Sequence, residues 1–183
     1  QFIKSGFIFI SCSTFASYFR PRLKILSLTT LIRYSDLIIE AASPQALGQL
    51  LPRIIRARKQ LLAMSAGALL GHPKLFQKAL SAAIPIYLPS GALVGLDGVK
   101  AASVGKLRSV TLTTRKPPRA FRAAPGADSQ RLKNLKTPLV LFQGPATQAC
   151  ALFPQNINVA ATLSLAGLGP RRTRVRIIAD PSI

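Results

Sequence analysis

The stretch Ile84–Lys100, I-P-I-Y-L-P-S-G-A-L-V-G-L-D-G-V-K, predicts a short strand, a glycine-rich turn and a helix in direct succession. Ile86–Leu88 are β-favouring residues between two prolines. Pro89–Gly91 indicate a turn, and Gly91 and Gly95 allow backbone conformations that a Cβ would forbid. A strand that opens into such a turn is a usual ligand position in an α/β protein, although a plain connecting loop is the other interpretation of this stretch alone.

Strands and helices alternate ahead of this stretch. Leu37–Ile39 and Leu61–Met64 are short apolar runs with the length of buried strands, and helices are expected from Ser43–Pro44 and over Pro73–Ala83. Alternation of this kind is typical of a parallel sheet with right-handed crossovers. We therefore expect a partial Rossmann-like parallel sheet that includes Ile86–Leu88.

The helix that begins near Ser43 contains a conflict. Ser43 suits the N-cap position and Pro44 the first turn. One face carries the residues that we expect to be buried, Leu47, Leu50, Leu51 and Ile54. Pro52 lies inside the same helix and lacks a backbone donor, at a cost on the order of 3 kcal/mol. We expect a kink or an early end there.

The pattern changes beyond the glycine-rich turn. Strands are expected at Val110–Thr114, Leu139–Phe142 and Val175–Ala179, and a helix over Asn156–Leu168. The basic segment Arg115–Lys136 is rich in proline and alanine and is expected to be loop. The predicted fold class is therefore α/β, a partial Rossmann-like parallel sheet followed by an incomplete α+β domain.

Three segments follow from these patterns: residues 1–33, residues 34–88 with the partial parallel sheet, and residues 89–183 with an incomplete α+β domain. Gln1–Phe19 is apolar, but its richest core, Phe7–Ile10, is too short to span a membrane. We expect residues 1–33 to be a misread or targeting segment.

The chain is strongly basic. Its 183 residues include 25 Lys and Arg against 5 Asp and Glu, a formal net charge of +20. Such a charge suggests a polyanionic partner, because cations that neutralise phosphates release counterions. The cations are scattered, however, with modest groups at Arg53–Lys59, Arg115–Lys136 and Arg171–Arg176, and no aromatic residues interleave them for base stacking. A basic nucleic-acid or acidic-surface binding protein is thus the alternative hypothesis, and a solvated basic surface is the favoured interpretation.

Few residues suggest catalysis directly. The sequence contains no phosphate loop of the G-x-x-x-x-G-K type and no evident triad or metal-ligand cluster. Cys12 and Cys150 each stand alone, so no metal site or disulfide framework is expected and a reducing compartment is the default. His72, the single histidine, lies between Gly71 and Pro73 and is expected to begin a helix rather than to catalyse.

Small residues follow three of the predicted strands: Ala41–Ala42, Ser65–Ala68 and Ser90–Ala92. Flat ligands need such openings, because missing side chains let them approach the backbone. Tight packing of helix on sheet is an equally good explanation of each group taken alone.

Four blocks of sequence resemble the L-aspartate dehydrogenase family in their order and spacing. They are D-L-I-I-E-A-A-S at 36–43, M-S-A-G-A-L at 64–69, V-T-L-T-T-R-K-P-P at 110–118 and F-P-Q-N-I-N-V-A-A-T-L-S-L-A-G at 153–167. The resemblance covers about residues 34–181 and leaves residues 1–33 unmatched.

This resemblance implies NAD(P)-dependent oxidation of L-aspartate to iminoaspartate by a cytoplasmic enzyme, homo-oligomeric when complete, with NAD or NADP as cofactor and no nucleic-acid or membrane partner. Ala92 and Asn158 match positions that bind the cofactor, and an Asn amide can fix a carboxamide through both its donor and its acceptor. A buried amide bond is the structural alternative for Asn158. Ala41 and Ser65 match more weakly, as residues at strand ends that approach the cofactor.

The resemblance also indicates two family features that the given sequence does not contain. The family's G-x-G-x-x-G fingerprint does not occur in it. The family's catalytic histidine follows the A-D-P motif, here Ala179–Pro181, and would lie beyond Ile183, so no catalytic residue is assigned. We expect the chain to be a fragment that shows no measurable aspartate oxidation by itself.

Overall fold

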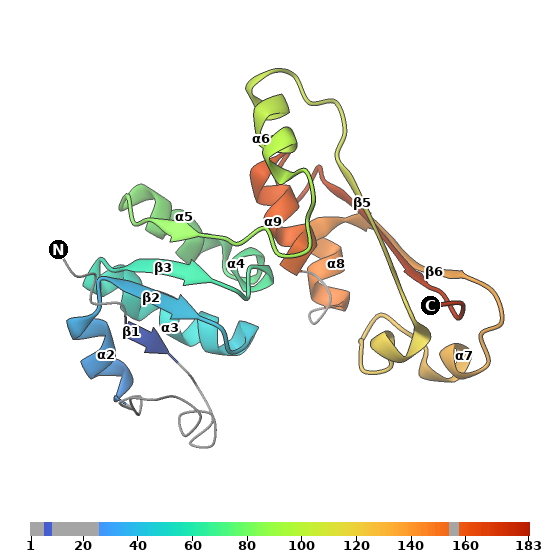
Figure 1. Ribbon diagram of the computed structural model, residues 1–183, viewed down its shortest axis with the longest axis horizontal. Helices are drawn as coiled ribbons and strands as arrows, with labels where there is room; N and C mark the ends of the chain where they lie inside the picture. Colours follow the sequence, from blue (N-terminus) through green and yellow to red (C-terminus); the bar gives the residue numbers. More distant parts are fainter. Residues whose placement is uncertain (1–5, 9–25, 154–157) are drawn as a thin grey trace. The chain divides into compact units, whose positions relative to one another are not determined.

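The computed structural model describes residues 6–8, 26–153 and 158–183. The chain divides into two units, one ending at Pro89 and the other beginning at Ser90 (Figure 1). The expectations for Gln1–Phe19 apart from residues 6–8, and the start of the helix expected from Asn156, lie outside the described residues.

The first unit is built on a parallel sheet with the order β1-β2-β3-β4. Each strand pairs with the next one along the chain, and helices fill the connections (Figure 1). The elements are β1 (Gly6–Ile8), α2 (Leu28–Tyr34), β2 (Leu37–Glu40), α3 (Pro44–Ala57), β3 (Gln60–Ala63), α4 (Gly67–Gly71), α5 (Pro73–Ser81) and β4 (Ile86–Tyr87). The Rossmann-like parallel sheet is thereby confirmed.

Local chemistry explains where α3 begins, and burial explains why it continues past Pro52. Ser43 is the N-cap, with its hydroxyl accepting from the Ala46 amide at 3.1 Å, as predicted. The three leucines and one isoleucine expected in the core, Leu47, Leu50, Leu51 and Ile54, are all buried. An early end at Pro52 is wrong, since the helix continues to Ala57. The turn after Pro52 buries Ile54 and Ile55, and burying such side chains contributes roughly 1.5–3 kcal/mol each, enough to offset the proline.

The second unit contains a mixed sheet with the order β5-β7-β6. β7 (Arg174–Ala179) pairs in parallel with β5 (Thr111–Lys116) and antiparallel with β6 (Leu139–Pro145). Its helices are α6 (Leu96–Val104), α7 (Ser129–Lys133), α8 (Ala146–Leu152) and α9 (Asn158–Ala166). The predicted change from strand-helix alternation to a mixed-sheet fold is confirmed.

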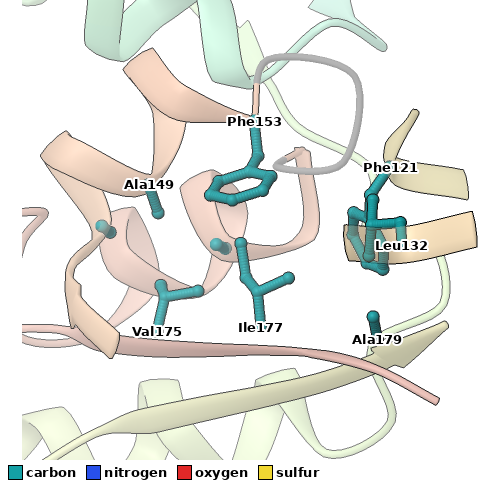
Figure 2. Close-up of a cluster of buried hydrophobic side chains, with 9 residues drawn as sticks. Phe121, Leu132, Ala149, Phe153, Val175, Ile177 and Ala179 are labelled. Atoms are coloured by element: carbon teal, nitrogen blue, oxygen red, sulfur yellow. The ribbon is translucent and has the colours of Figure 1, made fainter. Parts of the chain in front are cut away.

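The basic segment 115–136 corrects one expectation. It is not loop throughout, because it contains the last two residues of β5, then the 3-10 helix η1 (Pro118–Phe121) and α7. These short helices bring Phe121 and Leu132 into the core of the second unit. Figure 2 shows the side chains of Phe121 and Leu132 together on the side of Ala179, and Ile177 projecting from β7 toward the ring of Phe153. Two isolated apolar residues in a basic run have no periodicity, so the sequence did not reveal them.

Within the described residues, none of the helices combines the length and the apolar character that crossing a membrane requires.

Candidate cofactor-binding site

The carboxyl ends of β2 and β3 lie at one edge of the parallel sheet. Glu40, the last residue of β2, is in register with Ala63, the last residue of β3. The segments that leave these strands, 41–43 and 64–66, therefore emerge side by side. In open α/β sheets this edge is where ligands bind.

Two residues predicted for the site, Ala41 and Ser65, occupy these segments. Ala41 is exposed, whereas Ser65 is only 6% exposed. The Ser65 hydroxyl donates to Glu40 Oε1 at 3.0 Å, so it points to its neighbour in the protein. Ala41 is thus exposed beside the edge, while Ser65 is buried and bonded to Glu40.

Glu40 joins the two segments and was missed as a functional candidate. Its Oε1 also accepts from the backbone amides of Ala42 at 2.8 Å and Ser43 at 3.1 Å. Its Oε2 accepts from the Ser65 amide at 3.0 Å. The sequence signal that could have found it is a lone carboxylate at the end of an apolar strand, followed directly by small residues.

Ala92 lies in the turn that the opening stretch predicted. Gly91 has φ +59° and Gly95 has φ +84°, the left-handed backbone for which glycine was expected. Ala92 between them is exposed. Its neighbour Leu93 packs against the hydrophobic cluster formed by Leu96, Val110 and Leu163.

Asn158 is the first residue of α9, and it is exposed. It belongs to the second unit together with Ala92, whereas Ala41 and Ser65 belong to the first. The structure thus divides the predicted site residues between the two units: Ala41 and Ser65 follow neighbouring strands of the first, and Ala92 and Asn158 belong to the second.

His72 is the N-cap residue of α5, as expected for a helix-start residue. Its ring lies close to Gly48 of α3, where an added Cβ would be 2.6 Å from His72 Nε2. Among the residues with described positions, no group of three or more His, Cys, Asp or Glu could hold a metal ion.

The A-D-P motif ends the second unit with a buried carboxylate. Asp180 Oδ1 accepts from the Ser182 hydroxyl at 2.6 Å and from the Ser182 amide at 2.9 Å. Its Oδ2 accepts from Arg115 Nη1 of β5 at 2.8 Å. The Ser182 donors, with a smaller contribution from Arg115, lower the pKa of Asp180 from 3.8 to about 2.

Replacing Asp180 by Asn is expected to destabilise the second unit in a pH-dependent way. Because the pKa of the folded carboxyl is depressed, its contribution is complete above pH 3.8 and is lost as the pH falls toward 2. Urea unfolding of Asp180→Asn should show the full deficit at pH 7 and a shrinking one between pH 4 and 2. Asp97→Asn is the matched control, since Asp97 and Lys100 form an exposed pair at 3.3 Å that contributes little. An equal deficit for Asp180→Asn at pH 7 and pH 2 would contradict the prediction.

Comparison with known proteins agrees with both units. Residues 12–89 match a family model described as homoserine dehydrogenase, NAD binding domain, and residues 97–183 match one described as aspartate dehydrogenase, C-terminal. The first match begins at Cys12, well before the expected residue 34.

Several relatives match most of the chain. It is 41% identical to L-aspartate dehydrogenase of Methanosarcina barkeri over 87% of this chain and 66% of that one, and 45% identical to that of Methanosarcina acetivorans over 86% and 60%. The crystal structure of aspartate dehydrogenase from Thermotoga maritima superposes with a TM-score of 0.65 at 30% identity, over 81% of this chain and 60% of that one. The chain thus spans less than two thirds of the length of these relatives.

A Rossmann-like domain followed by a mixed-sheet domain, each matched by a dehydrogenase family model, defines a protein of the pyridine-nucleotide-dependent dehydrogenase class. Within this class, the chain belongs to the L-aspartate dehydrogenase family.

Proposed function

We propose that this protein serves the NAD(P)-dependent oxidation of L-aspartate to iminoaspartate. The observation that carries the proposal is the order of the two matches, an NAD-binding domain model over 12–89 and an aspartate dehydrogenase model over 97–183. Such a reaction would remove a hydride from Cα of aspartate, which a bound cofactor would accept, and a proton from the amine as the C=N bond forms. We further propose a cytoplasmic homo-oligomer that contains residues 34–88 as a cofactor domain and 89–183 as a substrate or dimerisation domain.

The residues at the sheet edge fit a dinucleotide. Ala41 and Ala42 are small and exposed, so a flat ligand can approach their backbone. When bound, NAD or NADP supplies the hydride acceptor. We assign the amide of Asn158 and the backbone beside Ala92 to the nicotinamide end, and the backbone at Ala41, with Ser65 behind it, to the other contacts. No residue of this chain is assigned the acid/base role.

NADH and NADPH binding, followed by fluorescence titration, tests the cofactor assignment. Asn158→Ala should weaken binding by about tenfold, the cost of roughly 1.4 kcal/mol for lost hydrogen bonds to the carboxamide. The matched control is Asn134→Ala, an exposed residue at the end of α7, which should bind as the unsubstituted protein does. Equal affinities for the two variants would remove Asn158 from the site.

The same titration separates the proposal from the alternative of polyanion binding. Dinucleotide affinity should change little between 50 and 200 mM salt, whereas a polyanion contacting 6–10 cations would lose on the order of a thousandfold or more. Steep salt-dependent binding of a single-stranded oligonucleotide, together with no response to NADH or NADPH, would favour the basic binding protein.

A further inference from the structure

Among the residues that the structure describes, the buried carboxylate of Glu40 bonds only to neutral donors. Glu40 is fully buried, and its four hydrogen bonds come from three backbone amides and one hydroxyl. Burying a carboxylate is costly unless such bonds satisfy it. The first turn of α3, a helix of 14 residues, begins directly after Ser43 and offers the positive end of its dipole. These hydrogen bonds to the carboxylate hold while both segments keep their positions around it.

The donors come from two places that are distant in sequence. Ala42 and Ser43 follow β2, and Ser65 follows β3, 25 residues after Glu40. Ser43 is also the N-cap of α3, so one carboxylate fixes the exit from a strand, the entry to a helix and the neighbouring loop. Hydrophobic packing alone would not fix the directions of these backbone groups.

A glutamate at the end of a strand in a dinucleotide-binding domain could instead contact a ribose hydroxyl. That role needs an accessible oxygen. Glu40 has 0% exposure, and both of its oxygens already accept hydrogen bonds from the protein. Direct contact with a ligand is therefore excluded for this geometry.

We propose that Glu40 is a positioning residue, which holds segments 41–43 and 64–66 in the shape that receives the dinucleotide. The proposal rests on the cofactor assignment made above. Glu40 would thus affect dinucleotide binding by fixing the backbone of Ala41 and Ala42, the exposed residues beside the carboxylate.

Amide hydrogen exchange without any cofactor tests the first half of the proposal. Glu40→Gln turns one acceptor into an amide donor, so the amides of Ala42, Ser43 and Ser65 should exchange faster by about tenfold. The Met64 amide is an internal control, because it donates at 2.9 Å to the backbone carbonyl of Glu40, which the substitution keeps. Unchanged exchange at all three amides would overturn the proposal.

Titration with NADH and NADPH tests the second half. The dissociation constant of Glu40→Gln should rise about tenfold at unchanged stoichiometry, whereas simple unfolding would lower the stoichiometry and leave the constant unchanged. Ser65→Ala, which removes one donor and keeps the carboxylate, should show a smaller rise. Ile54→Val, in the buried face of α3, lowers stability without touching the segments and should leave the constant unchanged.

Each outcome bears on a different claim. Faster exchange with an unchanged dissociation constant, or a constant that rises equally in Ile54→Val, would overturn the role of Glu40 in cofactor binding. Failure of the unsubstituted protein to bind either dinucleotide would overturn the proposed function, while the exchange data would still decide whether Glu40 fixes the two segments.

Discussion

Phe153→Ala is expected to lower the free energy of unfolding of the second unit by about 3–5 kcal/mol, a large part of the roughly 5–15 kcal/mol typical of a whole domain. Phe153 follows α8 directly and is fully buried. Its ring meets that of Phe121 edge to face, with centroids 6.1 Å apart, and that of Phe142 at the same distance. Truncation would remove both aromatic contacts and leave a cavity above Ile177 (Figure 2).

The surroundings of Phe153 leave little room for collapse into that cavity. A Cβ added at Gly126 would be 2.8 Å from the ring, so the backbone already touches it. Urea unfolding monitored by near-ultraviolet circular dichroism measures the loss. The matched control is Leu152→Ala, the preceding residue, whose side chain is 37% exposed and whose truncation should cost below about 1 kcal/mol. Similar costs for the two variants would show that the ring is not packed as described.

Features that depend on local chemistry could be predicted from the sequence. The start of α3 follows from Ser43 and Pro44, because capping involves only neighbouring residues. The positive φ angles of Gly91 and Gly95 follow from a turn that other residues avoid. The parallel sheet follows from the order of apolar runs and helices, since that order restricts the topology to a few choices.

Features that depend on distant residues could not be predicted. The role of Glu40 becomes visible only through the β2–β3 register, which brings Ser65 to it. Phe121 and Leu132 reach the core through short helices that carry no periodic pattern. The family resemblance predicted site residues in both halves of the chain, but the hydrogen bonds around Glu40 at the sheet edge required the structure.

Local and tertiary effects oppose each other most clearly in α3, where Pro52 disfavours the helix but buried side chains hold it. A second large effect on stability is therefore expected at Pro52. Pro52 is exposed in the middle of this helix, with five helical residues after it. It cannot donate to the carbonyl of Gly48, one turn earlier, and its ring crowds that carbonyl. The buried side chains of Ile54 and Ile55 hold the last turn in place despite this cost.

Pro52→Ala is therefore expected to stabilise the first unit by about 2 kcal/mol. Restoring the donor and removing the ring recovers roughly 3 kcal/mol, while the more flexible unfolded chain returns up to about 1 kcal/mol of that gain. Thermal and urea unfolding measure the change, and Arg53→Ala, at the next exposed position of α3, is the control that should shift stability by only about 0.5 kcal/mol or less. Because Pro52 is distant from the Glu40 segments in sequence and in its helix, dinucleotide affinity should stay unchanged in this variant. A neutral or destabilising result would mean that the proline is already accommodated, and that the burial of Ile54 and Ile55 has no local penalty to offset.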